Sequence, residues 1–195
     1  LQLIGSIMYM MARNARTPEA RRMLDGLQRR VRGLAMLHRT LYTKPEVTTI
    51  DGKEMVEALI ADLTEGMRLR DLEIESELVE VPLFPDQAVP LSMILAEAVT
   101  NAVKYAGRPQ GGGKARIDVT LHTEDQAVTL SVANTRGSLL IPLDVGDDAQ
   151  GDGLGKRLMQ AFERQLGGTS EVEETETRYV YRLRFERDDI GPRSA

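Results

Sequence analysis

The chain has 195 residues, of which 42% are hydrophobic, so it can form one well-packed domain and a smaller second module. A formal net charge of -5 without long runs of one sign, together with the absence of Trp, argues against nucleic-acid binding. The absence of Cys excludes disulfides, thiolate catalysis and cysteine zinc sites, and it is compatible with a cytoplasmic location. No apolar run approaches the roughly 18 to 20 residues that a membrane span requires, so we expect no direct membrane contact from this segment.

Two amphipathic helices are predicted at the start of the chain, within residues 1–43. Apolar side chains recur at helical spacing from Leu3 to Met11 and again from Met23 to Leu41, and Thr17 can cap the second helix. A hairpin of two such helices leaves apolar surface uncovered and invites a second hairpin. We therefore predict a homodimer that joins two hairpins in a four-helix bundle. Packing of the hairpin on the rest of the chain is the alternative.

Helices and strands are mixed in the remainder of the chain, after a linker at residues 44–50. The expected elements are a helix from Asp51 to about Met67, a strand over Leu72–Val81, a helix over Pro90–Tyr105, a hairpin of Lys114–His122 and Ala127–Ala133, a helix over Gly153–Leu166, and strands over Thr169–Glu173 and Arg178–Glu186. Helices that back a mixed, largely antiparallel sheet form a two-layer α/β sandwich, so the expected fold class is α+β. We expect this domain to span residues 51–188, with a tail at 189–195, and we interpret residues 138–150 as a mobile loop.

The long predicted helix carries several polar residues on one face. Glu97, Asn101 and Lys104 recur at spacings of four and three in EAVTNAVKYA, and Tyr105 follows directly. A carboxylate, an amide and an ammonium beside a buried apolar face are costly unless something polar lies against them. A solvated helix face with an internal contact between Glu97 and Lys104 is the alternative.

A run of glycines leads directly into a later helix, in GDGLGKRLMQAFERQLGG. Gly151, Gly153 and Gly155 let backbone amides approach a ligand, and a helix N-terminus favours an anion such as a phosphate group. Similar runs also occur in ordinary loops. Taken alone, the run is therefore weak evidence for a phosphate-binding site.

Together, the two segments resemble the N box and the second glycine box of the GHKL ATPases, which include gyrase, the heat-shock chaperone ATPase, histidine kinases and the mismatch-repair protein MutL. Their order, their separation and the intervening strand hairpin fit this family. The helical hairpin at residues 1–43 narrows the resemblance to two-component sensor histidine kinases, in the branch related to the HWE kinases. The resemblance implies a homodimeric, ATP-dependent kinase that phosphorylates its own His and passes the phosphate to an Asp of a response-regulator receiver domain.

The resemblance also implies roles for individual residues, with ATP and Mg2+ as cofactors. Asn101 would bind Mg2+ and bridge it to the ATP phosphates, and Glu97 would be the catalytic residue that orients or deprotonates the attacking group. Lys104 and Tyr105 would line the phosphate and ribose side. The phosphates would lie against the residues of the glycine box, which are Gly151, Gly153, Leu154 and Gly155.

One further box departs from the usual form of the family. In SVANTRGSLL, Asn134 stands where the family has an Asp that accepts a hydrogen bond from adenine, and Arg136 and Ser138 stand where glycines are usual. Asn134 can still accept through its amide oxygen and remains a nucleotide-binding candidate. Because a neutral acceptor is weaker than a charged one by about 1 kcal/mol, we expect reduced ATP affinity.

Neither histidine of the chain is assigned as the phosphoacceptor. His38 falls near the end of the second predicted helix and His122 in a predicted strand, where histidines more often pack or form hydrogen bonds. The resemblance places the reactive His upstream of Leu1. The chain begins without Met and inside an apolar pattern, which we interpret as a truncation just after that His. A sensor domain, for example of the PAS type, would precede it.

Two other functions compete with the kinase interpretation. A degenerate GHKL protein could use the hairpin as a phosphotransfer or docking platform without kinase activity, and Asn134 favours this alternative. An anti-sigma Ser/Thr kinase could use Glu97 and Asn101 similarly, but such a protein has no need of a dimerising hairpin.

Overall fold

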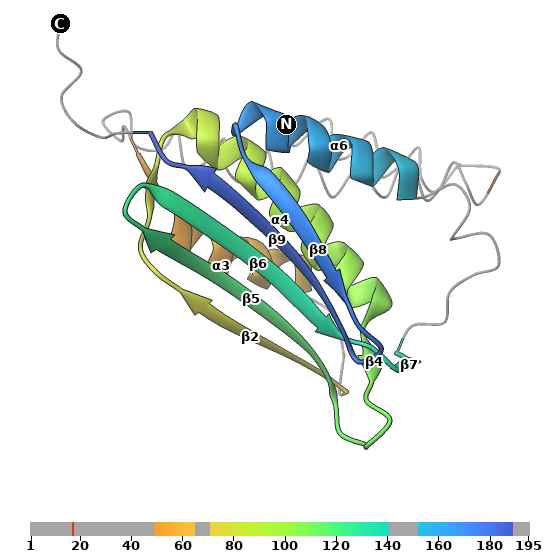
Figure 1. Ribbon diagram of the computed structural model, residues 1–195. Helices are drawn as coiled ribbons and strands as arrows, with labels where there is room; N and C mark the ends of the chain where they lie inside the picture. Colours follow the sequence, from red (N-terminus) through yellow and green to blue (C-terminus); the bar gives the residue numbers. More distant parts are fainter. Residues whose placement is uncertain (1–16, 18–48, 65–70, 141–151, 189–195) are drawn as a thin grey trace, which may run out of the picture.

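The computed structural model describes residues 17, 49–64, 71–140 and 152–188, which form a two-layer α+β domain (Figure 1). One layer is a five-stranded sheet of β2 (Leu72–Leu78), β5 (Ala115–Glu124), β6 (Ala127–Thr135), β9 (Arg178–Glu186) and β8 (Thr169–Glu174) in that spatial order. The other layer contains the helices α3 (Gly52–Thr64), α4 (Pro85–Tyr105) and α6 (Asp152–Gln165). Two short pairs complete the described fold, β1 (Ile50–Asp51) with β3 (Pro82–Leu83) and β4 (Gly107–Arg108) with β7 (Ser138–Leu139). The predicted fold class is confirmed.

The sheet is mixed, as expected. Strand β2 pairs in parallel with β5, with Leu72 opposite Ala115, whereas all other neighbours in the sheet are antiparallel. The predicted hairpin of β5 and β6 is confirmed, and both strands are longer than predicted. Its two-residue turn places Asp125 at a φ of 55°, a left-handed conformation that Asp tolerates better than most residues.

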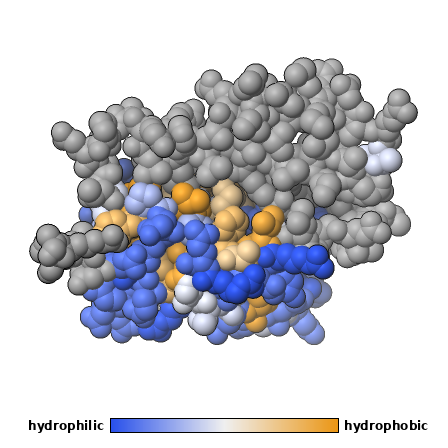
Figure 2. Space-filling view, turned by 90° about the horizontal axis from the view of Figure 1, so that it is seen from above, coloured by the Kyte–Doolittle hydropathy of each residue, from blue (hydrophilic) through white to orange (hydrophobic). Residues whose placement is uncertain are grey.

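Helix α4 lies at the centre of the helical layer, because it packs against both α3 and α6 as well as against the sheet. Its side chains Leu91, Ile94 and Val99 are fully buried. They meet the inward-facing residues of the strands, such as Ile117 and Leu130, which alternate with outward-facing residues. Burying each such side chain contributes about 1.5–3 kcal/mol. Figure 2, seen from above, shows apolar residues at the surface in the middle of the view, with hydrophilic residues below them.

Helix α4 begins at Pro85, five residues earlier than the predicted start at Pro90, so the prediction was wrong at this end. Pro90 favours a helix start because a proline deeper inside a helix removes one main-chain hydrogen bond. Contacts from elsewhere hold the additional turn in place. Gln87 Nε2 donates to the carbonyl of Glu186 at 2.9 Å, and its Oε1 accepts from Asp188 N at 3.1 Å. The helix start is thereby fixed to the end of β9.

The other helix ends follow their local signals. Asp51 Oδ1 accepts a hydrogen bond from the main-chain N–H of Lys53 at 2.8 Å, which caps α3. Helix α6 is followed by Gly167 at a φ of 62°, and Gly168 N donates to the Glu163 carbonyl at 3.0 Å, so the two glycines end the helix.

Several predicted segments differ from the structure or fall outside the described residues. Ile50 belongs to the predicted linker, but it forms β1 and is buried, because its side chain joins the core. Ser138 and Leu139 belong to the predicted loop, but they pair with β4. The first strand ends at Leu78 and not at Val81. Both helices of the predicted hairpin lie outside the described residues, apart from the exposed Thr17, as does the remainder of the loop up to residue 151.

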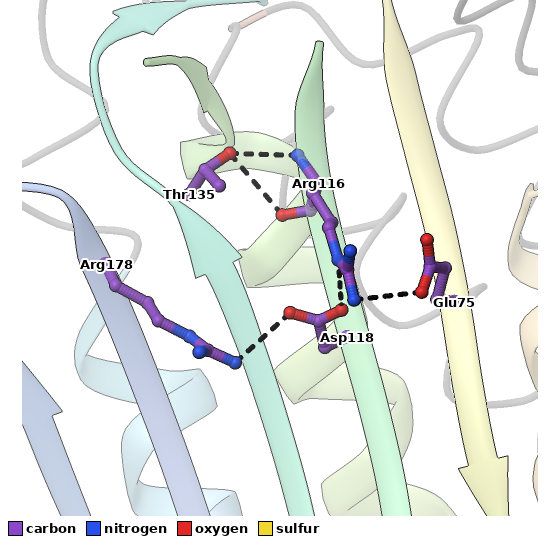
Figure 3. Close-up of polar contacts among 5 residues, drawn as sticks. All are labelled: Glu75, Arg116, Asp118, Thr135 and Arg178. Carbon is purple, nitrogen blue, oxygen red and sulfur yellow. Dashed lines mark hydrogen bonds and ion pairs between the residues drawn. The ribbon is translucent and has the colours of Figure 1, made fainter. Parts of the chain in front are cut away.

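The outer face of the sheet carries paired charges (Figure 3). Arg116 on β5 contacts Glu75 of β2 at 2.8 Å and Asp118 at 2.5 Å, and Arg178 of β9 reaches Asp118 at 3.1 Å across β6. His122 lies exposed on β5. None of the described helices is long and apolar enough to cross a membrane.

Candidate functional site

The C-terminal half of α4 is mostly buried except for a polar stripe. Glu97, Asn101 and Lys104 are partly buried on this stripe, as the spacing predicted, and Tyr105 is partly buried at the last position of the helix. The ammonium of Lys104 lies 4.9 Å from the centre of the Tyr105 ring, within the range of a cation–π contact. The stripe therefore presents a carboxylate, an amide and a cation at the surface of an otherwise buried helix.

Asn134 lies near the end of β6 and is 3% exposed. Its Nδ2 donates to the carbonyl of Tyr105 at 3.4 Å and to the carbonyl of Thr135 at 3.0 Å. Because both partners are carbonyl oxygens, the amino group must face them, and the Oδ1 acceptor, which lies in the same amide plane, points away from them. The end of β6 is thus joined to the end of α4, and the orientation of the amide is set by the fold.

Thr135 makes a second connection at the same end of the sheet. Its hydroxyl donates to the Gly107 carbonyl at 2.9 Å. It also accepts from the main-chain N–H of Arg116 at 2.9 Å, as Figure 3 shows. One side chain therefore links β6, β5 and β4. No local signal in the sequence identifies Thr135, since a threonine in a strand is ordinary and its partners are distant in the chain.

The close antiparallel pairing of β4 and β7 requires glycine at residues 107 and 137. Gly137 adopts a φ of 152°, and a Cβ atom built on it would lie 1.8 Å from the Arg108 carbonyl oxygen. Gly107 also approaches closely, since its Cβ would lie 2.6 Å from the Gly137 nitrogen. The main-chain N–H of Leu140 then donates to the Ala106 carbonyl at 3.2 Å. The chain after β6 is therefore held tightly against the segment that follows α4.

Arg136 binds the turn between β8 and β9 from the other side. Its main-chain N–H donates to the Thr177 carbonyl at 2.8 Å. Its guanidinium donates to the Thr175 carbonyl at 2.8 Å and pairs with the Glu174 carboxylate at 2.7 Å. In the sequence Arg136 stands out only as a departure from the family pattern, and no local signal predicts these contacts.

The glycine run is only partly within the described residues. Helix α6 begins at Asp152, so Gly153, Leu154 and Gly155 belong to its first turn, whereas Gly151 lies outside the described residues. Figure 1 shows the N-terminal end of α6 at the same end of the molecule as the C-terminal end of α4 and the β4–β7 pair. The main-chain N–H groups of a first helical turn lack helical partners and favour an anion.

Two family models match the chain. The model described as histidine kinase matches residues 1–67, and the model described as histidine kinase-, DNA gyrase B-, and HSP90-like ATPase matches residues 86–187. The second match includes nearly all of α4, the end of β6 and the whole of α6. The comparison with curated proteins gave no match.

Solved structures of histidine kinases share the fold. The histidine kinase domain from Erythrobacter litoralis EL346 blue-light activated histidine kinase is 15% identical, with a TM-score of 0.67 and coverage of 95% of both chains. A second structure of that kinase is 18% identical with a TM-score of 0.66, and the match covers 84% of this chain and 54% of that chain. Acinetobacter baumannii histidine kinase AdeS is 14% identical with a TM-score of 0.55, and the match covers 88% of this chain and 82% of that chain.

Proposed function

We propose the function of this chain from the premise that it belongs to the family of histidine kinase-, DNA gyrase B- and HSP90-like ATPases, whose model matches about half of it. With the match of residues 1–67 to a histidine kinase model, it is a sensor histidine kinase by family. The proposed activity is transfer of the γ-phosphoryl group of ATP to a histidine of the dimerisation region. From there the phosphoryl group would pass to an Asp of a response-regulator receiver domain.

We propose that the chain forms two parts, a dimerising hairpin and an ATP-binding domain. Residues 1–43 are proposed to form the dimerising hairpin and residues 51–188 the ATP-binding domain, to which Ile50 is added because it is buried in the core. We place the protein in the cytoplasm, where ATP and receiver domains are found together, with input from an N-terminal sensor domain.

The observation that carries the proposal is the junction between Asn134 and the end of α4. Its hydrogen bond to the Tyr105 carbonyl brings a buried amide to the last turn of the helix that carries Glu97, Asn101 and Lys104. A base-reading acceptor and phosphate-side residues would then lie on one continuous surface. The first turn of α6, with Gly153, Leu154 and Gly155, is proposed to hold the phosphates together with Gly151.

A magnesium ion fits this set of residues only together with the nucleotide. Among the described residues, no group of three His, Asp or Glu side chains could hold a metal by itself. Mg2+ prefers oxygen ligands and keeps several waters, so the amide oxygen of Asn101 and the phosphate oxygens form an adequate donor set. Bound Mg-ATP supplies the phosphoryl group and neutralises its charge.

The remaining chemistry is positioning by the side chains of α4. The Glu97 carboxylate would orient the attacking imidazole and accept its proton, as a nitrogen–phosphorus bond forms and the bond from the γ-phosphorus to the bridging oxygen breaks. Lys104 and Tyr105 would line the phosphate and ribose side. ADP is the leaving group, and Asn134 would accept a hydrogen bond from the adenine amino group more weakly than a carboxylate would.

Calorimetry with a non-hydrolysable ATP analogue tests the proposal, with and without Mg2+, on the full chain and on Asn101→Ala. We expect magnesium-dependent binding that the variant loses. Thr100→Ala, in the same turn of α4, is the matched control and should bind like the parent. Absence of binding to the parent at millimolar nucleotide would overturn the proposal.

Asn134 favours one second candidate, a docking or phosphotransfer platform that retains the fold without kinase activity. The neutral acceptor at a buried position weakens the case for tight ATP binding. Incubation with γ-labelled ATP and a histidine-containing dimerisation segment separates the two functions. A protein-bound label that is lost in acid but stable in alkali supports the kinase. Nucleotide binding without transfer of the label supports the platform. Label on Ser or Thr would instead indicate a kinase of the anti-sigma type.

A further inference from the structure

Arg136 connects the exit of β6 to a turn that is about forty residues away in the chain. Three of its contacts converge on residues 174–177, two from the guanidinium and one from the main-chain N–H. The turn is itself ordered by its own hydrogen bonds, since Thr175 N donates to the Arg178 carbonyl at 2.8 Å and the Thr175 hydroxyl accepts from Arg178 N at 3.0 Å. Arg136 therefore binds a defined structure.

Residues 134–137, the segment that contains Arg136, are also held on the side that faces α4 and β4. Asn134 and Thr135 are bonded to the end of α4 and to β4, and Gly137 has no room for a side-chain atom beside Arg108. Residues 134–137 are thus held between the β4 segment on one side and the β8–β9 turn on the other. Loss of the contacts on either side would allow the end of β6 to shift.

We propose that Arg136 is a positioning residue for recognition of the nucleotide base, an inference that rests on the proposed function. By fixing the strand exit to the β8–β9 turn, it holds the Asn134 amide in the orientation in which Oδ1 faces the adenine amino group. Arg136 itself does not touch the nucleotide. Its cation already pairs with Glu174, and its other donated bond goes to a main-chain carbonyl, so its charge is compensated locally.

A direct contact with the phosphates is the competing role for an arginine near a nucleotide. It makes a different prediction, because phosphates are common to all nucleoside triphosphates whereas the amino group at this position distinguishes adenine from guanine. Base selectivity therefore separates positioning of Asn134 from phosphate binding. General destabilisation of the fold would also lower the affinity for both nucleotides alike.

The experiment measures calorimetric affinity of the full chain for non-hydrolysable ATP and GTP analogues with Mg2+. The variants are Arg136→Ala, Arg136→Lys and Glu174→Gln, and thermal unfolding of each confirms the fold. Arg182→Ala is the matched control, since it removes an ion pair with Glu171 between the same two strands away from the turn. Because the Arg136 side chain is 40% exposed, we expect a moderate effect.

For Arg136→Ala, affinity for the ATP analogue should fall roughly three- to tenfold and affinity for the GTP analogue should stay within about twofold, so that selectivity is lost. Arg136→Lys, which can keep the pair with Glu174, should recover most of the selectivity, and Glu174→Gln should lie between Ala and the parent. Arg182→Ala should leave both affinities unchanged.

Two outcomes overturn this inference alone, provided that the parent binds the ATP analogue. One is unchanged selectivity in a folded Arg136→Ala, and the other is an equal loss for both nucleotides, which assigns Arg136 to the phosphates or to overall stability. If the parent binds neither nucleotide, the proposed function fails and the inference fails with it.

Discussion

The side-chain amide of Asn134 donates to the main-chain carbonyl of Tyr105, although the two residues are 29 positions apart. The same amino group also bonds the carbonyl of Thr135 at 3.0 Å. The last turn of α4 and the end of β6 therefore form one hydrogen-bonded unit. Replacement of Asn134 tests this unit most directly.

Asn134→Asp should destabilise the domain at neutral pH, although the family resemblance places an Asp at this position. A carboxylate cannot donate to the carbonyls of Tyr105 and Thr135, so three oxygens would face one another at a site that is 3% exposed. We expect a loss of about 1–3 kcal/mol in the free energy of unfolding, measured by urea titration at pH 7.5. The deficit should shrink at pH 5, since a protonated carboxyl can donate again. Equal stability of variant and parent at pH 7.5 would contradict the orientation of the amide.

Gly137→Ala should be among the most damaging small substitutions in the domain. Its Cβ would lie 1.8 Å from the Arg108 carbonyl oxygen, and the backbone φ of 152° disfavours a side chain. We expect a loss of about 3 kcal/mol or more by chemical denaturation. Gly111→Ala is the matched control, because nothing lies within 4 Å of the place that its Cβ would occupy, and it should stay within about 0.5 kcal/mol of the parent. If Gly137→Ala is tolerated, β4 and β7 do not approach each other as closely as described.

Tyr181→Phe should change how stability depends on alkaline pH. Burial raises the pKa of Tyr181 to about 12, and the nearby Ser170 side chain opposes this shift only in part. Between the ordinary pKa of 10.0 and about 12, the unfolded chain loses this proton while the folded protein keeps it, so stability falls as pH rises. The variant should lack this part of the decline.

At neutral pH the same variant should be as stable as the parent or slightly more stable, since the Tyr181 hydroxyl is buried without a hydrogen-bond partner among the described residues. Thermal unfolding at pH 7.5 and pH 11 measures both effects. Parallel pH profiles of parent and variant would show that the phenol is solvated.

Glu73→Gln should weaken the attachment of the edge strand β2 slightly. Glu73 pairs with Lys114 at 2.8 Å on the surface, and the Lys114 ammonium holds the pKa of this carboxyl below its ordinary value. The contribution of the pair is therefore present at neutral pH and is lost as pH falls from the ordinary value of 4.5 through the lowered pKa of the folded protein. Both groups are exposed, so the effect should be small and should diminish in high salt.

Hydrogen exchange of the β2 amides at low and high salt is the measurement for Glu73→Gln, with Glu77→Gln on the same strand as the control. Faster exchange in Glu73→Gln at low salt alone is the expected result. The same exchange rates in both variants would remove any specific role of the pair.

Local patterns were sufficient to predict most of the described elements. The helix that starts after Asp51, the helix that ends near Leu166 and the strands β5, β6 and β9 each depend on patterns within a few neighbouring residues, and the structure confirms these elements. The polar stripe of α4 was predicted for the same reason, since spacings of three and four place residues on one face of any helix. Resemblance to a family then connected these local features to a nucleotide site.

Contacts between distant residues decided the rest. The parallel pairing of β2 with β5, the early start of α4 at Pro85 and the bonds of Arg136 to the β8–β9 turn depend on partners that a local pattern does not contain. The orientation of the Asn134 amide is the clearest case, since the residue type shows an available acceptor, and only the two carbonyls that meet its amino group in the folded chain determine which way that acceptor points.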